Sequence, residues 1–206
     1  MTLKICVAQL NFVVGDMAGN ARRIAQAARE AHARGVRLVL TPELALCGYA
    51  AEDLFLRPAF VDACDDALNW LVQETADLNG LTLVVGHPAR QASAGRRERS
   101  VSVASLSNAA SVLCEGHITH CYAKRELPNY QVFDERRYFV PGHEACVFDV
   151  AGDDGRPVRV GLLICEDAWF EAPAADARAA GAELLAVINA SPFHAGKGGE
   201  REATMA

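Results

Sequence analysis

The sequence contains no apolar run approaching the ~20 residues that a membrane-spanning helix needs. It also lacks the features of a secretory signal peptide, because residues 1–4 lead directly into a strand-like segment without a long apolar region or a cleavage site. These two absences argue against a membrane protein and against a secreted one. We therefore expect a cytoplasmic protein.

Closely spaced cysteine pairs are missing as well. The sequence has seven cysteines, and none of them stands in a CxxC pattern. Such scattered cysteines are typical of free thiols in a reducing compartment, and they argue against a disulfide framework or a zinc site. Only His117 and His120 have a metal-like spacing, and they fall in an expected strand, where residues three apart face opposite sides. We therefore expect no metal site.

The sequence has no excess of positive charge. Its net charge is −6 at pH 7, which argues against nucleic acid or an anionic membrane as the main partner. Internal repeats and low-complexity segments are absent too. With 206 residues, of which 51% are hydrophobic and 22% charged, the chain is typical of one globular domain with a substantial core.

Short apolar segments alternate with amphipathic helical patterns in the first part of the chain, and hairpin patterns follow. This order predicts an α/β architecture in which helices cover one side of each sheet. We expect helices between Asn20 and Gly35, from Pro58 to Asn79, and over residues 174–180. We expect strands over residues 3–10, 36–40, 81–85, 101–106, 109–114, 117–122, 145–150, 158–164 and 184–188.

The stretch with the clearest chemical signal covers residues 157–170. An apolar run with the length of a buried strand ends abruptly in Cys165, Glu166 and Asp167. A lone cysteine after such a run is usually a small buried hydrophobe, but two carboxylates belong at a wet strand end. Because nearby carboxylates raise the pKa of a thiol, a nucleophilic Cys165 needs a cation and a base from elsewhere. Two further strand ends offer candidates, Glu43 and Lys124.

Together these three segments resemble the nitrilase, or carbon–nitrogen hydrolase, superfamily. Members of that superfamily are αββα sandwiches with a Glu–Lys–Cys triad, so the resemblance implies this fold and the triad Glu43, Lys124 and Cys165. Longer motifs are similar to the glutaminase domains of glutamine-dependent NAD⁺ synthetases, and they extend from Met1 to about Arg201. These longer motifs lie at residues 42–49, 52–58, 127–139 and 189–197, whereas the resemblance to the superfamily as a whole lies at residues 42–44, 122–129 and 163–167.

The resemblance implies hydrolysis of L-glutamine with release of ammonia. In that reaction Cys165 attacks the side-chain carboxamide and forms a thioester, and Glu43 is the general base. Lys124 is expected to offset the charges of Glu166 and Asp167, to favour the thiolate and to stabilise the oxyanion.

The resemblance also implies supporting and substrate-binding residues. Glu135 is expected to orient Lys124 and the substrate amide. Free glutamine carries an α-ammonium and an α-carboxylate, so its site needs groups of both signs; Glu166 suits the ammonium and Lys197 suits the carboxylate. The residues expected around the amino acid are Tyr49, Tyr130, Phe133, Glu166, Ser191 and Lys197.

Full-length synthetases of this kind carry a second domain, which uses ATP and Mg²⁺ to amidate nicotinic acid adenine dinucleotide. Its ATP-pyrophosphatase loop is absent here, and the sequence stops at Ala206, before the last strands of the sandwich. We therefore expect residues 1–206 to be a truncated carbon–nitrogen hydrolase domain, incomplete at its C-terminus and without a cofactor of its own. The expected partners are L-glutamine, a synthetase domain and further copies of the chain.

Two other interpretations remain open. The chain is alternatively a stand-alone amidase that acts on another small amide or carbamoyl compound, or a non-catalytic module that docks to and regulates a synthetase. A Cys–His protease is disfavoured, because none of the six histidines lies in a recognisable protease context.

Overall fold

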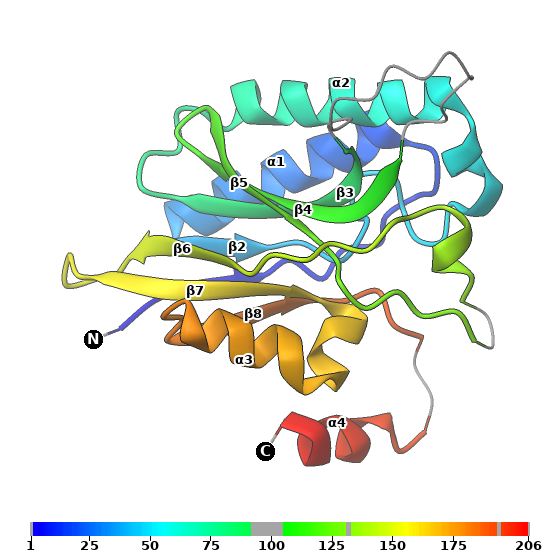
Figure 1. Ribbon diagram of the computed structural model, residues 1–206. Coiled ribbons are helices and arrows are strands. Elements are labelled where there is room, and N and C mark those ends of the chain that lie inside the picture. The colour runs from blue at the N-terminus through cyan, green and yellow to red at the C-terminus, as the bar shows by residue number, and fades with distance from the viewer. Residues whose placement is uncertain (1, 92–104, 131–132, 193–194, 206) are drawn as a thin grey trace.

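The computed structural model describes residues 2–91, 105–130, 133–192 and 195–205. These residues form strands, α-helices and short 3₁₀ helices that alternate along the chain (Figure 1). The strands are β1 (Ile5–Val7), β2 (Leu38–Leu40), β3 (Thr82–Arg90), β4 (Leu106–Cys114), β5 (His117–Ala123), β6 (Cys146–Ala151), β7 (Pro157–Ile164) and β8 (Leu184–Ile188). The helices are α1 (Met17–Ala33), α2 (Pro58–Glu74), α3 (Glu171–Ala179) and α4 (Lys197–Met205), with the 3₁₀ helices η1 (Glu52–Leu56), η2 (Glu135–Arg137) and η3 (Cys165–Trp169).

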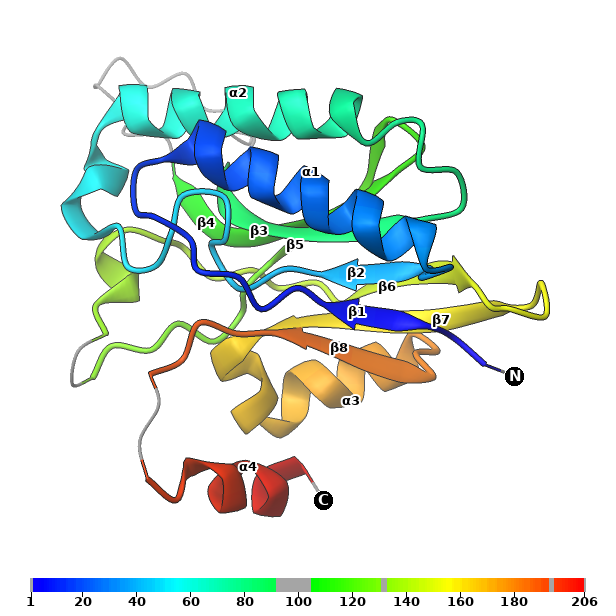
Figure 2. The same ribbon diagram turned by 180° about the vertical axis from the view of Figure 1, so that it is seen from behind.

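The strands form two sheets. The first has the order β1-β2-β3-β4-β5, in which β1, β2 and β3 are parallel and β4 and β5 are antiparallel additions. The second has the order β6-β7-β8, with β7 antiparallel to β6 and parallel to β8. Seen from behind, β1 and β8 are the near edges of the two sheets (Figure 2).

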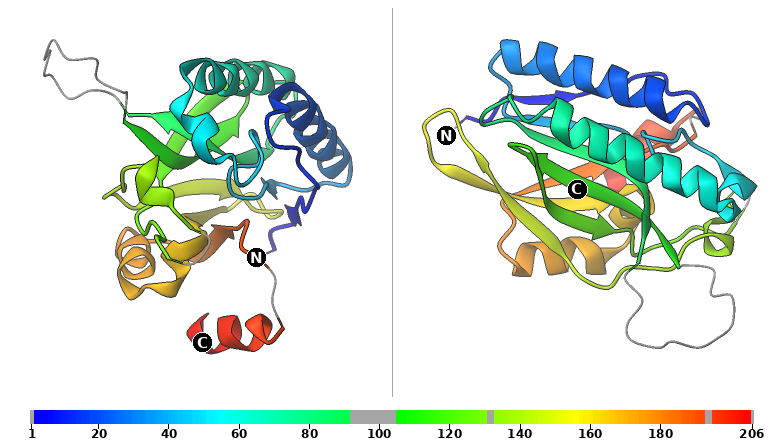
Figure 3. Two further views of the ribbon diagram at one scale, coloured as in Figure 1. Left: turned by 90° about the vertical axis from the view of Figure 1, so that its right-hand side faces the viewer. Right: turned by 90° about the horizontal axis from the view of Figure 1, so that it is seen from above.

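The sheets and helices stack in four layers. Helices α1 and α2 cover the outer face of the first sheet, and α3 covers the outer face of the second (Figures 1 and 3). Val39 belongs to the core between the first sheet and its helices, whereas Leu38 belongs to the core between the sheets, so β2 is apolar on both faces. The predicted αββα sandwich is therefore confirmed.

The first helix begins at Met17, earlier than the predicted start at Asn20. Asp16 is the N-cap instead, and its Oδ1 accepts a hydrogen bond from the Gly19 backbone N–H at 2.9 Å. Asn20 lies inside α1, fully buried, and its Nδ2 donates to the Val13 and Leu46 carbonyls. Its polar character therefore serves to fix neighbouring loops rather than to begin the helix.

Strand β3 is longer than predicted. We expected it to end at Val85, but it continues through Pro88 to Arg90, because β4 pairs with it along its whole length and places Pro88 opposite Asn108. Of the predicted strand over 101–106, residues 101–104 lie outside the described residues. Strand β8 has its predicted bounds, whereas α4 was not predicted.

Among the residues described, no helix combines the length and the apolar character that crossing a membrane requires.

Candidate active site

The three predicted catalytic residues follow three different strands. Glu43 follows β2, Lys124 follows β5 of the same sheet, and Cys165 follows β7 of the facing sheet. Lys124 and Cys165 come directly after the last residues of their strands, whereas Glu43 lies three residues beyond Leu40. The structure therefore brings distant parts of the sequence together: Glu43 and Lys124, which are in contact, lie 81 positions apart.

Lys124 lies at the centre of this site. Its Nζ is 2.6 Å from Glu43 Oε1 and 2.8 Å from Glu135 Oε1. The exposed fraction is 0% for Lys124, 1% for Glu43 and 5% for Glu135, so the two ion pairs are shielded from water. Buried ions are tolerated only with such close, hydrogen-bonded partners.

Three further groups complete the hydrogen bonding of the two carboxylates. Asn108 Nδ2, from β4, donates to Glu43 Oε1 at 2.8 Å and to Glu135 Oε2 at 3.2 Å. The backbone N–H of Ala190 donates to Glu43 Oε2 at 3.2 Å, and the Tyr49 hydroxyl donates to Glu135 Oε1 at 3.4 Å. Both glutamates are thus held from several elements at once.

The pKa values of Lys124 and Glu135 are both raised, for different reasons. Burial lowers the pKa of Lys124, but Glu43 and Glu135 more than offset it, so the pKa of Lys124 is raised and the ammonium stays charged. Burial and the nearby Glu43 raise the pKa of Glu135 to about 7, against the opposing effect of Lys124. Glu135 is therefore partly protonated near neutral pH.

Cys165 is the first residue of η3 and is 5% exposed. Its φ of +48° lies in the left-handed region, which costs a non-glycine residue about 1–3 kcal/mol and is common at functional turns. Burial and the Glu43 carboxylate raise the pKa of the Cys165 thiol, whereas Lys124 lowers it. Because the net shift is upward, the free site holds a protonated thiol beside a carboxylate that can accept its proton.

Glu166 and Asp167 are not the partners of Lys124 that we expected. Lys124 pairs with Glu43 and Glu135 instead. Glu166 accepts a hydrogen bond from the Tyr130 hydroxyl at 2.8 Å, and Asp167 is fully buried among hydrogen-bond donors of its own.

The residues expected around the substrate lie in three local sets. Tyr49 contacts Glu135 within the buried network. The Tyr130 and Phe133 rings pack edge to face with centroids 5.7 Å apart, next to Glu166. The third set joins Lys197 Nζ to the Ser191 hydroxyl and, at 3.0 Å, to the Pro192 carbonyl.

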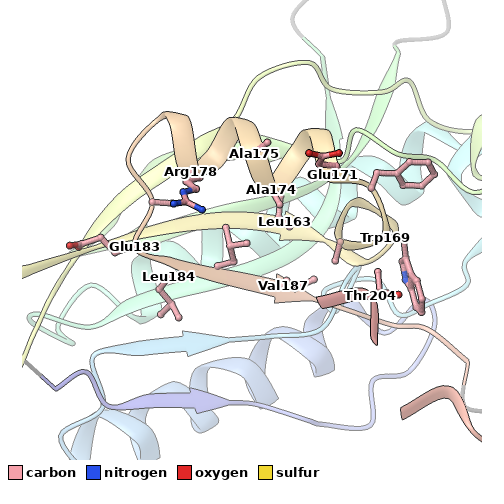
Figure 4. Close-up of a pocket in the computed structure, with 14 residues that line it drawn as sticks. Leu163, Trp169, Glu171, Ala174, Ala175, Arg178, Glu183, Leu184, Val187 and Thr204 are labelled. Atoms are coloured by element: carbon pink, nitrogen blue, oxygen red, sulfur yellow. The ribbon is translucent and has the colours of Figure 1, made fainter. Parts of the chain in front are cut away.

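Two cavities lie near these elements. One, of about 250 Å³, is lined by Tyr130, Glu166 and Phe170 among others, and so opens beside the candidate substrate residues. Another, of about 930 Å³, lies between β8, α3 and α4 and is lined largely by apolar side chains such as Leu184 and Val187 (Figure 4). None of Glu43, Lys124 and Cys165 lines the larger cavity, so it is separate from the chemistry. Within the described ranges, no group of three or more His, Cys, Asp or Glu side chains is arranged to hold a metal ion.

Sequence reasoning missed Asn108, the bond from the Ala190 N–H and the contacts of Asp167. Asn108 carries a larger polar side chain than its small neighbours Ser107, Ala109 and Ala110 in β4, and this contrast was the available signal. The Ala190 contact had no signal, because a backbone N–H carries no mark in the sequence.

An αββα sandwich that encloses a Glu–Lys–Cys cluster is the arrangement that the sequence motifs implied. Residues 4–206 match the sequence model of the carbon-nitrogen hydrolases. The chain belongs to the carbon-nitrogen hydrolase family.

Similar proteins of known name fall into two groups. The chain is 46% identical over 209 residues to a glutamine-dependent NAD(+) synthetase of Xylella fastidiosa. This alignment covers 99% of this chain and 34% of that protein. Superposition on the glutamine-dependent NAD+ synthetase of Acinetobacter baumannii gives a TM-score of 0.84 at 28% identity, over 100% of this chain and 35% of the other. An amidase from Nesterenkonia sp. gives 0.72 at 25% identity, over 94% and 66%. The chain thus spans about a third of the length of the curated relatives it matches.

Gly86 provides the first test of how the site is held. A Cβ at this position would lie 2.5 Å from the Pro42 carbonyl oxygen and 2.6 Å from the Leu44 nitrogen, on either side of Glu43. We expect Gly86→Ala to displace this segment and to lower the free energy of unfolding by about 1–3 kcal/mol, measured by urea denaturation. Gly199→Ala is the control, because nothing lies within 4 Å of its Cβ and alanine favours the helix. Equal stability of the Gly86 variant and the wild type would contradict the close packing around Glu43.

The second test uses the pH dependence of stability. The pKa of Glu135 rises from its ordinary value near 4.5 to about 7 on folding, so between these values the folded state binds a proton that the unfolded state lacks. Stability from this group is complete below about pH 4.5 and is lost as the pH rises through 7. Relative to Glu135→Gln, the unfolding free energy of the wild type should fall by on the order of 3 kcal/mol between pH 4 and 8. Groups that do not interact with Glu135 titrate alike in both proteins and cancel in this difference, so a flat difference curve refutes the raised pKa.

Proposed function

We propose that this chain hydrolyses the side-chain amide of L-glutamine through a thioester on Cys165 and releases ammonia. The observation that carries the proposal is the buried Lys124 ammonium, held between Glu43 and Glu135 beside a protonated thiol. A buried acid–base pair next to a nucleophile suits attack on an amide, which needs deprotonation of the nucleophile and protonation of the leaving nitrogen. The named relatives support glutamine as the amide.

The first half of the reaction forms the thioester. Glu43 takes the proton from the Cys165 thiol as the sulfur attacks the carboxamide carbon. The Lys124 ammonium stabilises the negative oxygen that develops. The C–N bond then breaks as Glu43 returns the proton to the nitrogen, and ammonia leaves.

The second half regenerates the enzyme. Glu43 takes a proton from a water molecule, whose oxygen attacks the thioester carbon. The C–S bond breaks, the thiol recovers its proton from Glu43, and glutamate is released. Glu135, with Asn108, keeps Lys124 and Glu43 in place throughout.

Substrate selection falls to residues around the buried network and to Tyr49, whose hydroxyl contacts it. Glu166, whose orientation is fixed by the Tyr130 hydroxyl, binds the α-ammonium of glutamine. Lys197 and Ser191 bind its α-carboxylate. Tyr49 and Phe133 form apolar walls around the carbon chain.

We further propose that the ammonia serves a synthetase unit that uses ATP and Mg²⁺ to convert nicotinic acid adenine dinucleotide to NAD⁺. This unit belongs either to the same polypeptide or to a partner, and the assembly is a cytoplasmic homo-oligomer. The relatives support this role because those with this name are about three times as long as the matched region. Residues 1–206 contribute the carbon–nitrogen hydrolase domain.

A stand-alone amidase is the second candidate. It is favoured by the similarity to the Nesterenkonia amidase, because the chain covers 66% of that protein. In a variant of that amidase, acrylamide has added to the active-site cysteine.

A non-catalytic regulatory module is a third candidate. The buried network argues against it, because burying three ionisable groups costs stability, and a module without a reaction has no use for such a cluster.

Ammonia release separates the three candidates. We expect the chain to hydrolyse glutamine at least about tenfold faster than asparagine or N-carbamoyl amino acids, because only glutamine matches both the ω-amide and the α-groups. Cys165→Ala should lower the rate by about 1,000-fold or more while the fold is retained, and a glutamine-mimicking diazo ketone should label Cys165.

The other outcomes are equally informative. Turnover of asparagine or carbamoyl compounds with indifference to glutamine assigns the chain to the stand-alone amidases. A wild-type chain that is folded, inactive on every substrate and unlabelled by the diazo ketone is a regulatory module, and the proposed reaction is then wrong.

A further inference from the structure

Asp167 is a fully buried carboxylate that the reaction above does not use. Each of its two carboxylate oxygens accepts two hydrogen bonds. Oδ1 accepts from the backbone N–H groups of Arg125, at 3.0 Å, and Glu126, at 2.8 Å. Oδ2 accepts from the Tyr122 hydroxyl, at 2.9 Å, and from the backbone N–H of Ile164, at 3.0 Å.

These four donors come from the two segments that carry the reactive groups. Tyr122, Arg125 and Glu126 surround Lys124 on β5 and just after it, whereas Ile164 directly precedes Cys165 at the end of β7. Since β5 and β7 belong to different sheets, the bonds to Asp167 cross from one layer of the sandwich to the other.

The remaining backbone bonds of Lys124 do not make this link. Its N–H donates to the Asn108 carbonyl within the first sheet, and its carbonyl accepts from Gly142. Neither bond reaches the segment of Cys165. The segments of the lysine and the thiol are therefore linked through Glu43 and through the bonds to Asp167. A further contact, the ion pair between Arg125 and Asp176 of α3 at 2.8 Å, joins the lysine segment to the helix over the second sheet and does not involve the segment of Cys165.

We propose that Asp167 is a positioning residue that fixes Lys124 relative to Cys165 by joining the ends of β5 and β7. The proposal rests on the proposed function only in taking Cys165 as the nucleophile. A carboxylate suits this task because both oxygens are acceptors. An amide of the same shape has one oxygen, so its NH₂ group would face two of the four donors and would push them apart.

Asp167→Asn tests the proposal, since it changes the hydrogen-bonding capacity but hardly the volume. We expect its kcat for glutamine to fall by about 100-fold with KM within about threefold, as for a misplaced catalytic group. The pH profile of iodoacetamide addition at Cys165, followed by peptide mass spectrometry, should shift to higher pH. The positive charge of Lys124 lowers the pKa of the thiol, and in this variant Lys124 would lie farther from Cys165. Glu43 and Glu135, which raise the pKa of the thiol, would stay in place.

Two further variants complete the series. Tyr122→Phe removes one of the four donors and keeps the carboxylate, so it should shift the alkylation profile in the same direction by less. Asp176→Asn is the matched control: it makes the same chemical change at a largely exposed residue that contacts the Arg125 side chain at 2.8 Å. Its alkylation profile should equal that of the wild type.

A purely structural role for Asp167 gives a different result. Asp167→Asn would then lower the melting temperature, but the folded protein would keep the wild-type alkylation profile and kcat. An unmoved profile in whichever of Asp167→Asn and Tyr122→Phe folds overturns the proposal. Because alkylation needs no glutamine, a wild-type chain that fails to hydrolyse glutamine refutes the proposed function and leaves this test intact.

Discussion

The site depends on one interaction, the bridging of two buried carboxylates by the Lys124 ammonium. Removing an ion from water costs several kcal/mol even after relaxation of the protein. Contacts of 2.6 Å to Glu43 and 2.8 Å to Glu135 offset this cost only if all three side chains keep their places. The surrounding structure supplies that constraint: close packing at Gly86 holds the Glu43 segment, and Asn108 holds both glutamates.

The charges of this network also explain the state of the thiol. One ammonium faces two carboxylates, of which Glu135 has a pKa of about 7, so the network is close to neutral when Glu135 is protonated. The cation therefore has little surplus charge to stabilise a thiolate, and the pKa of Cys165 is raised. In the proposed reaction, a resting thiol of this kind reacts when a substrate is bound and its proton can pass to Glu43. Such a site is protected from unwanted reactions of a free thiolate.

The sequence predicted the parts of the site that interrupt an apolar pattern. Glu43, Lys124 and Cys165 each follow a strand-like run, and the family resemblance predicts that they belong to one site. It could not predict the contacts that depend on how strands pair. Strand β3 passes through Pro88 because β4 lies beside it, and the same register places Asn108 near the glutamates.

Asp167 illustrates a different limit. In the sequence it is an acid two residues after a thiol, so simple electrostatics predicts repulsion that Lys124 must offset. In the structure it is saturated by four donors, and Lys124 pairs elsewhere. The charge of a residue can be read from sequence, whereas the donors that compensate it come from segments that only the folded chain brings together.

The most direct measurement of the central claim is a mutant cycle on the free energy of unfolding. Lys124→Met alone leaves two buried carboxylates without their cation and should cost about 3–5 kcal/mol. In a background that already carries Glu43→Gln and Glu135→Gln, the same change should cost much less, because the lysine then has no charged partner to lose. Equal costs in the two backgrounds would show that the three side chains do not form one charge-compensated unit, and would contradict the account.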